Sequence, residues 1–356
     1  MRVIWTIASK DIVDAIKSKT TLSIIFGVML TTLSGQALPL LLKIKDVPTA
    51  AVYDAGDARL VDVLRRREDL RVYTVRSQAE MESLLTERTE AVLGLVLPAD
   101  FDTTLANGQK VTLQGYAAHW VKVEDIAKLQ ILFEREISAM TNQTIQIDTT
   151  TPRLYPTSDA GGQLVMMTMS LVIATVLICI TLVPYLIIDE KETHTIDALL
   201  VSPASVGQVV AGKAIAGAVY GLLAGGLAVI FGRIVVVHGW VAILTVVCGT
   251  VFAVAIGLIL GSIFDNPQSM GVWMGVVTMA LLVPVFTEMM TMNETWPAIV
   301  RALLPQMPTA LLSSLFRLSF TETVSSPEIF GHLGMVLLWS LPLYAFVVWR
   351  VRRMDR

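Results

Sequence analysis

The residues whose types and spacing could do chemistry gather in the polar segment 189–208, which lies between two long apolar runs. Acidic side chains surround Lys191 at its start, and Leu199-Leu200 and then Ser202-Pro203 follow. Because proline cannot continue a helix, this order predicts a short helix that ends before Pro203. A short helix with an acidic start and two apolar side chains suits a groove on a partner protein. The same residues also fit a solvated turn with an interfacial anchor, and the residue types alone favour neither.

The apolar runs that flank this segment are long enough to cross a membrane. Of the 356 residues, 54% are hydrophobic and only 16% are charged, and the mean hydropathy is +0.65. Soluble domains carry about 25% charged residues. Backbone inside lipid must satisfy its own hydrogen bonds, so each run of about 20 uncharged residues is predicted to be a transmembrane helix. The six predicted spans are 20–42, 162–188, 211–232, 241–264, 270–287 and 331–349.

The distribution of Lys and Arg predicts the orientation, because short cytoplasmic loops are enriched in these residues. If both termini are in the cytoplasm, most Lys and Arg residues of the short loops and termini lie on the cytoplasmic side. The segment 189–208 and the tail 351–356 are then cytoplasmic as well. The residues concerned are Arg2, Lys10, Lys17, Lys19, Lys191, Lys213, Arg350, Arg352, Arg353 and Arg356. Residues 1–19 have helical apolar spacing and are expected to form an amphipathic cytoplasmic helix at the membrane interface, although a simple extension of the first span also fits.

A water-soluble insertion separates the first two spans. Residues 46–160 hold 12 Lys and Arg and 18 Asp and Glu, a net charge of −6, which leaves +3 for the rest of a chain whose total is −3. Short apolar runs alternate with helical patterns here, which predicts a small extracytoplasmic α/β domain. The predicted strands are 49–53, 70–75, 91–97 and 111–117, and the predicted helices are 58–67, 78–86, 98–106 and 123–141. Residues 148–160 are expected to be a linker.

Two further features concern the part of the chain within the membrane, 162–350. The segment 291–330 is apolar but is interrupted by three prolines, which favours short re-entrant helices on the outer side. Small residues also recur every four positions in the spans, and such rows allow close helix packing, either within one subunit or between subunits. The glycines singled out are Gly217, Gly221, Gly225, Gly257 and Gly261.

Several classes of function are disfavoured. The spans contain no Asp, Glu, Lys or Arg apart from Lys213 at the mouth of the third, which argues against ion-coupled transport and intramembrane proteolysis. No phosphate-binding Gly-x-x-x-x-Gly-Lys-Ser/Thr motif occurs, so no nucleotide site of its own is expected. The two cysteines and four scattered histidines suggest no metal site, and no basic patch with interleaved aromatics suggests nucleic-acid binding. We therefore expect no catalytic residues and no bound cofactor or metal.

The segment after the second span resembles the cytoplasmic signature of type 2 ABC transporter permeases. The matching residues are Glu190, Glu192, Thr195, Leu199, Leu200, Ser202, Pro203, Gly212 and Lys213. The chain departs from that pattern at His194, where the family usually has Gly. The strand–Pro–x–Asp–Phe pattern of 91–101 is similar to one in the extracytoplasmic domains of such permeases. The overall plan, one domain after the first span and then five spans, is similar as well.

This resemblance implies the membrane subunit of an ATP-driven exporter, in the cell membrane of a bacterium or archaeon. A cytoplasmic ABC ATPase dimer would bind the ATP and Mg²⁺, and a second permease subunit, identical or related, would complete the transporter. Glu190, Glu192, Thr195, Leu199, Leu200, Ser202 and Pro203 would contact the ATPase. The rival hypothesis is a receptor or scaffold whose outer domain binds a ligand or envelope protein. It is disfavoured because a single span would suffice for that role.

Overall fold

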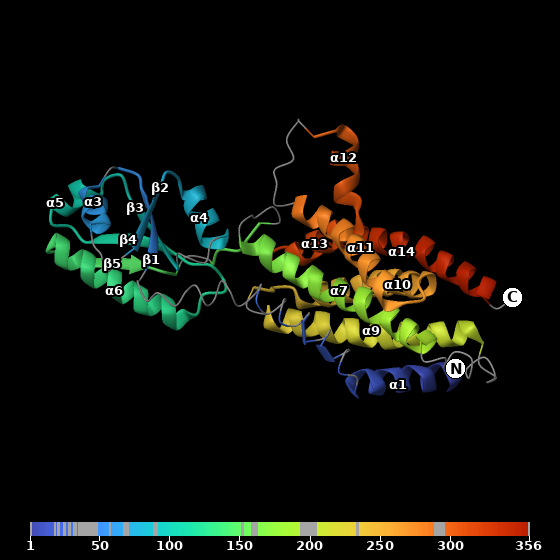
Figure 1. Ribbon diagram of the computed structural model, residues 1–356. Coiled ribbons are helices and arrows are strands. Elements are labelled where there is room, and N and C mark those ends of the chain that lie inside the picture. The colour runs from blue at the N-terminus through green and yellow to red at the C-terminus, as the bar shows by residue number, and fades with distance from the viewer. Residues whose placement is uncertain are drawn as a thin grey trace. The chain divides into compact units, whose positions relative to one another are not determined.

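The computed structural model describes most of the chain in two compact units, which are treated separately below (Figure 1). One unit is an α/β domain within residues 37–164, to which residues 320–322 are also assigned, and the other is a bundle of helices formed by the rest. The described residues are 2–17, single positions between 19 and 34, 49–56, 58–66, 71–87, 92–150, 153–157, 163–192, 205–232, 235–287 and 296–354.

The α/β unit is built on a five-stranded sheet with the strand order β2-β1-β3-β4-β5. Its strands are β1 Thr49–Asp54, β2 Arg71–Val75, β3 Leu93–Leu97, β4 Val111–Tyr116 and β5 Ile145–Asp148. β1 runs parallel to β2 and β3, β4 runs antiparallel to β3, and β5 runs parallel to β4. The interior strand β1 is buried at successive residues, as expected for a strand covered on both faces.

Helices cover both faces of this sheet (Figure 1). They are α3 Arg59–Arg65, α4 Gln78–Glu87, α5 Phe101–Ala106 and α6 Val123–Thr141. Phe133 and Ile137 of α6 pack with α3 and α5 in one apolar cluster, while Met81 and Leu85 of α4 form a second cluster. All four predicted strands and all four predicted helices are present. β5 is absent from the prediction, because four residues with two buried side chains give too short an alternation to recognise.

The helical unit contains five helices that are long and apolar enough to cross a membrane, counted among the described residues. They are α7 Gln163–Glu192, α9 Val206–Phe231, α10 Gly239–Ile263, α11 Pro267–Thr287 and α14 Ser326–Met354. These helices correspond to five of the six predicted spans. The remaining one, 20–42, lies largely outside the described residues.

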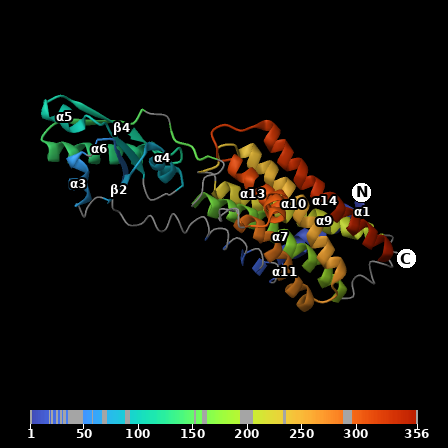
Figure 2. The ribbon, with the colours of Figure 1, turned by 90° about the horizontal axis from the view of Figure 1, so that it is seen from above.

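Figure 2 shows the helices of this unit from a second direction. The spans differ in how much of their surface is buried. In α7 and α10, 72% of the most apolar 18-residue stretch is buried, compared with 17% in α11 and 22% in α14. α7 and α10 therefore form the centre of the helical unit, and α11 and α14 expose apolar side chains to their surroundings. An apolar exposed surface on a helix of this length is what contact with lipid requires.

The segment predicted to be re-entrant forms three short helices. They are α12 Ala298–Leu303, the 3₁₀ turn η1 Leu304–Gln306 and α13 Pro308–Leu318. The chain bends by 62° between η1 and α13, a geometry found both in re-entrant loops and in broken spans. Leu312, Leu315 and Phe316 of α13 are fully buried, so α13 is part of the core of the helical unit.

The N-terminal helix α1 Arg2–Lys17 packs against α9 (Figure 1). Its inner face carries the buried residues Ile7 and Ala8, whereas Trp5 and Ile16 are exposed. A Cβ atom on Gly212 would lie 2.7 Å from Cγ2 of Ile7, so the glycine is needed for this close approach. α1 thus has one apolar side against α9 and further apolar side chains facing outward, and its position at the membrane interface stays a prediction.

Candidate functional site

Lys213 of α9 is buried at the end of the helical unit where α7 ends and α9 begins. Its side chain is 2% exposed, and its Nζ atom lies 3.0 Å from Oε2 of Glu190 and 3.3 Å from Oδ2 of Asp11. The same ammonium group donates a hydrogen bond of 2.8 Å to the backbone oxygen of Leu186. We call Asp11, Glu190 and Lys213 the buried triad. It joins α1, α7 and α9.

The composition of the buried triad explains why these helices converge. An ammonium group has three hydrogen-bond donors, and removing it from water is costly unless they are all matched. The Asp11 carboxylate and the Leu186 carbonyl accept hydrogen bonds from this group, and the Glu190 carboxylate forms an ion pair with it. Burial raises the pKa of Asp11 above its ordinary value of 3.8, Lys213 opposes this shift, and the Glu190 carboxylate adds to it. The triad carries two negative charges and one positive charge when all three groups are ionised.

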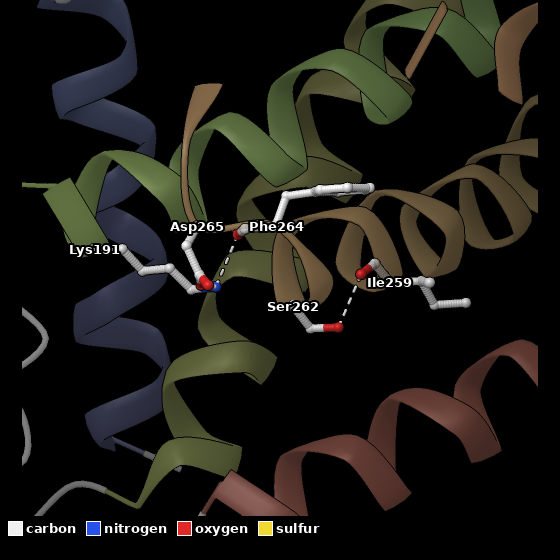
Figure 3. Close-up of polar contacts among 5 residues, drawn as sticks. All are labelled: Lys191, Ile259, Ser262, Phe264 and Asp265. Carbon is white, nitrogen blue, oxygen red and sulfur yellow. Dashed lines mark hydrogen bonds and ion pairs between the residues drawn. The ribbon is translucent and has the colours of Figure 1, made fainter. Parts of the chain in front are cut away.

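Lys191, the next residue of α7, makes a second connection (Figure 3). Its Nζ atom donates to Oδ1 of Asp265 at 2.8 Å and to the backbone oxygen of Phe264 at 2.9 Å. Phe264 directly follows α10, so Lys191 interacts with the carbonyl end of that helix, where a cation is favoured. Lys191 therefore attaches α7 to the turn between α10 and α11.

These contacts hold the last turn of α7 on several sides at once. Glu190 faces α1 and α9, and Lys191 faces the turn after α10. At the other end of the polar segment, Ser205 begins α9 with a capping box, in which its Oγ accepts from the Gln208 N–H at 3.3 Å and its own N–H donates to the Gln208 side chain at 3.2 Å. Both ends of the segment 189–208 are therefore fixed to the helical unit.

The structure describes only part of the predicted contact residues. Glu190 is 8% exposed and its carboxylate is paired with Lys213 of the same chain. Glu192 is the last residue of α7, and only its backbone is described. Thr195, Leu199, Leu200, Ser202 and Pro203 lie outside the described residues. A direct contact of this segment with an ATPase stays a prediction.

The five predicted glycines lie at contacts between spans of this chain. A Cβ atom on any of them would meet a neighbour within 3.0 Å, and the nearest neighbours come from α7 and α10. Gly217 contacts Val183, Gly221 contacts Cys179, Gly225 contacts Val246, Gly257 contacts the Cys179 backbone and Gly261 contacts Ile187. In this structure they allow α7, α9 and α10 to pack closely within one subunit.

Three residues of this site lie outside the prediction: Asp11, Lys191 and Asp265. The sequence did indicate that an acidic residue such as Asp11 would be needed, because a lysine inside an otherwise apolar span requires a buried acidic partner. The identity of that partner was not visible, since Asp11 and Lys213 are 202 residues apart. Tyr220 adds a further contact of this kind, because its hydroxyl donates to the backbone oxygen of Ile12 at 2.5 Å.

A family model described as ABC-2 family transporter protein matches residues 20–349. The chain belongs to the ABC-2 family of transporter proteins. A search of curated proteins finds no match. As an ABC-2 permease, the chain is a multi-pass membrane protein, and the matched range includes α7, α9, α10 and α11 and most of α14. The rival reading as a receptor or scaffold is not supported by this membership.

Proposed function

We propose that this ABC-2 permease is the membrane subunit of an exporter driven by a separate ATPase that docks on the segment 189–208. The observation that carries the proposal is the attachment of both ends of this segment to the helical unit. Its first end is held by Glu190 and Lys191, and its second end continues into the helix that carries Lys213. A force applied to the segment would therefore reach α1, α7, α9 and α10 together.

Rigid attachment matters because a docking loop transmits movement only if it cannot deform on its own. The buried triad and the contact of Lys191 with Phe264 link helices that are far apart in the chain. Packed helices then move as near-rigid bodies, which is how domain motions usually arise. We propose that ATP-driven closure of the ATPase dimer moves the spans of the permease in this way.

The charge distribution supports a cytoplasmic position for this end of the molecule. Lys191 and Lys213 lie here, and the last turn of α14 carries Arg352 and Arg353. Positively charged residues are enriched on the cytoplasmic side of membrane proteins. In this proposal both termini are cytoplasmic and the α/β unit is extracytoplasmic. The ATP and Mg²⁺ would be bound by the ATPase, and a second permease subunit, identical or related, would complete the export pathway.

Co-purification tests the docking of an ATPase. The permease would be expressed with the ABC ATPase encoded beside it and purified by a tag on the permease. We expect the ATPase to co-purify, and we expect Leu199→Asp with Leu200→Asp to remove it, because charged side chains would not enter an apolar groove. Leu303→Asp is the matched control, since Leu303 is an exposed leucine of α12, 57% exposed.

Two results would contradict the proposal. One is co-purification of the ATPase with the double variant at the wild-type amount. The other is a topology result, in which a cysteine placed at position 197 reacts with an impermeant thiol reagent added to the outside of intact cells. The two native cysteines, Cys179 and Cys248, are both buried, so the background labelling should be low.

A further inference from the structure

The end of α14 carries three arginines where its apolar stretch stops. That stretch, Ser326–Arg350, has 25 residues, and Arg352 and Arg353 follow in the last turn. In both views this end of α14 lies at the same end of the helical unit as the N-terminus of α1 (Figure 1, Figure 2). At 1.5 Å per residue the stretch is about 38 Å long, which exceeds the roughly 30 Å of a hydrocarbon core. Arg350 is therefore expected close to the level of the lipid headgroups.

Aromatic and cationic side chains share one exposed side of α14 near this end. Phe346, Trp349 and Arg353 are three and four residues apart, a spacing that places them on one side of a helix. The rings of Phe346 and Trp349 have centroids 5.6 Å apart, and the guanidinium carbon of Arg353 lies 4.4 Å from the centroid of the Trp349 ring. Both rings are exposed. An exposed face that changes from apolar to aromatic to cationic matches the order of hydrocarbon, interface and headgroup in a bilayer.

Arg350 lies on the same side of α14 and is the least exposed of the three arginines. It follows Phe346 by four residues and precedes Arg353 by three. Arg350 is half-buried, and its Nε atom is buried without a hydrogen-bond partner among the residues that the structure describes. It also forms no ion pair with any of those residues. A guanidinium group is always charged and has five donors, so its partial removal from water is costly unless an anion accompanies it.

Two other cations near the ends of spans show how such a charge is matched within the protein. Lys213 pairs with Glu190 and Lys191 pairs with Asp265, and each lysine also donates to a backbone carbonyl. Arg350 has neither kind of partner in the described part of the chain. The partial negative charge at the end of α14 favours arginine there, but it does not supply a hydrogen-bond acceptor for this side chain. An anion from outside the chain would supply one.

We propose that Arg350 and Arg353 bind the phosphate group of an anionic phospholipid whose acyl chains lie along α14. Guanidinium groups bind phosphate through paired hydrogen bonds. A lipid anion fits better than a soluble one, because the exposed rings of Phe346 and Trp349 adjoin the arginines and only 22% of the most apolar stretch of α14 is buried. The site goes beyond the proposed export function. It requires that α14 crosses the bilayer, but it requires neither an ATPase nor a direction of transport.

Lipid binding to the permease alone tests this site. The delipidated full chain in detergent would be titrated with phosphatidylglycerol or with phosphatidylcholine of the same acyl chains, and bound lipid would be counted by native mass spectrometry. We expect phosphatidylglycerol to bind about ten-fold more tightly, and we expect Arg350→Gln and Arg353→Gln each to reduce this preference about three- to five-fold. Arg350→Lys should retain most of it, because the charge is kept. Lys10→Gln, which removes an exposed positive charge from α1, should leave the preference unchanged.

Arg353 is exposed, so Arg353→Gln keeps the proposal testable even if Arg350→Gln does not fold. Melting temperatures of the lipid-free proteins measure folding. Equal binding of the two lipids by wild type would overturn the proposal, as would an unchanged preference in the arginine variants or an equal loss in Lys10→Gln.

A soluble phosphate is the alternative ligand. Displacement of phosphatidylglycerol by glycerol 3-phosphate would show that the arginines take a free phosphate, and this result would also overturn the proposal. Leu199→Asp with Leu200→Asp should keep the lipid preference. Because no ATPase is present, failure of this experiment is distinguishable from failure of the docking experiment.

Discussion

Glu190 and Lys191 are adjacent in α7, yet their side chains pair with different helices. Glu190 lies 3.0 Å from Lys213 of α9, and Lys191 lies 2.8 Å from Asp265 in the turn after α10. Neighbouring residues of an α-helix point about 100° apart, so two consecutive charges can reach opposite neighbours. The pair makes the last turn of α7 the junction of the helical unit, directly before the segment proposed to receive the ATPase.

The first prediction concerns the lysine of the buried triad. Lys213→Met should lower the free energy of unfolding by about 3–5 kcal/mol, because it leaves two buried carboxylates without a cation. Asp11→Asn should cost less, since Lys213 keeps Glu190 as a partner. Thermal unfolding in detergent measures both. Lys10→Met is the control, because Lys10 is exposed on the same helix, and an equal loss in Lys213→Met and Lys10→Met would contradict a stabilising role for the triad.

The second prediction concerns pH. Because the folded-state pKa of Asp11 is raised above 3.8, the folded protein binds this proton more tightly than the unfolded chain does. The resulting stability is fully present below pH 3.8 and is lost as the pH rises through the folded-state pKa. The wild type should therefore lose stability relative to Asp11→Asn as the pH is raised from 4 to 8. Melting temperatures across this range measure the effect, and Asp14→Asn, on the exposed face of α1, should run parallel to wild type.

The third prediction separates the two contacts of Lys191. Asp265 is 85% exposed, so its ion pair should contribute only about 0–1 kcal/mol. Lys191 itself is 14% exposed and also donates to the Phe264 carbonyl. Lys191→Met should therefore reduce both stability and any ATPase stimulation more than Asp265→Asn does. Indistinguishable effects of the two variants would show that the carbonyl contact is unimportant.

The fourth prediction concerns helix packing. A Cβ atom at Gly257 would lie 2.7 Å from the backbone oxygen of Cys179, which cannot move without shifting α7. Gly257→Ala should therefore destabilise the protein by about 1–3 kcal/mol. Gly226→Ala in α9 is the matched control, because no atom lies within 4 Å of its Cβ position, and alanine favours a helix over glycine by about 1 kcal/mol. Thermal unfolding of both should give shifts of opposite sign, and a stable Gly257→Ala would contradict the packing described for α7 and α10.

The length and composition of the apolar runs alone determined that this chain is a helical membrane protein. A backbone in lipid must satisfy its own hydrogen bonds, so runs such as 162–188 and 241–264 could only be helices, and α7 and α10 are found there. The short apolar runs of the insertion likewise predicted β1 to β4. These features depend on neighbours within a few positions, which is why they can be read without a structure.

Only the tertiary structure decided how the charged site is assembled. Lys213 was visible as a charge in an apolar run, but its partner Asp11 lies 202 residues away on another helix. Their pairing depends on α1 packing closely on α9 at Gly212, where Ile7 occupies the space that a larger side chain would take. The helical period predicts which face of α1 is apolar, but the neighbour of that face is set by how all the helices fit together.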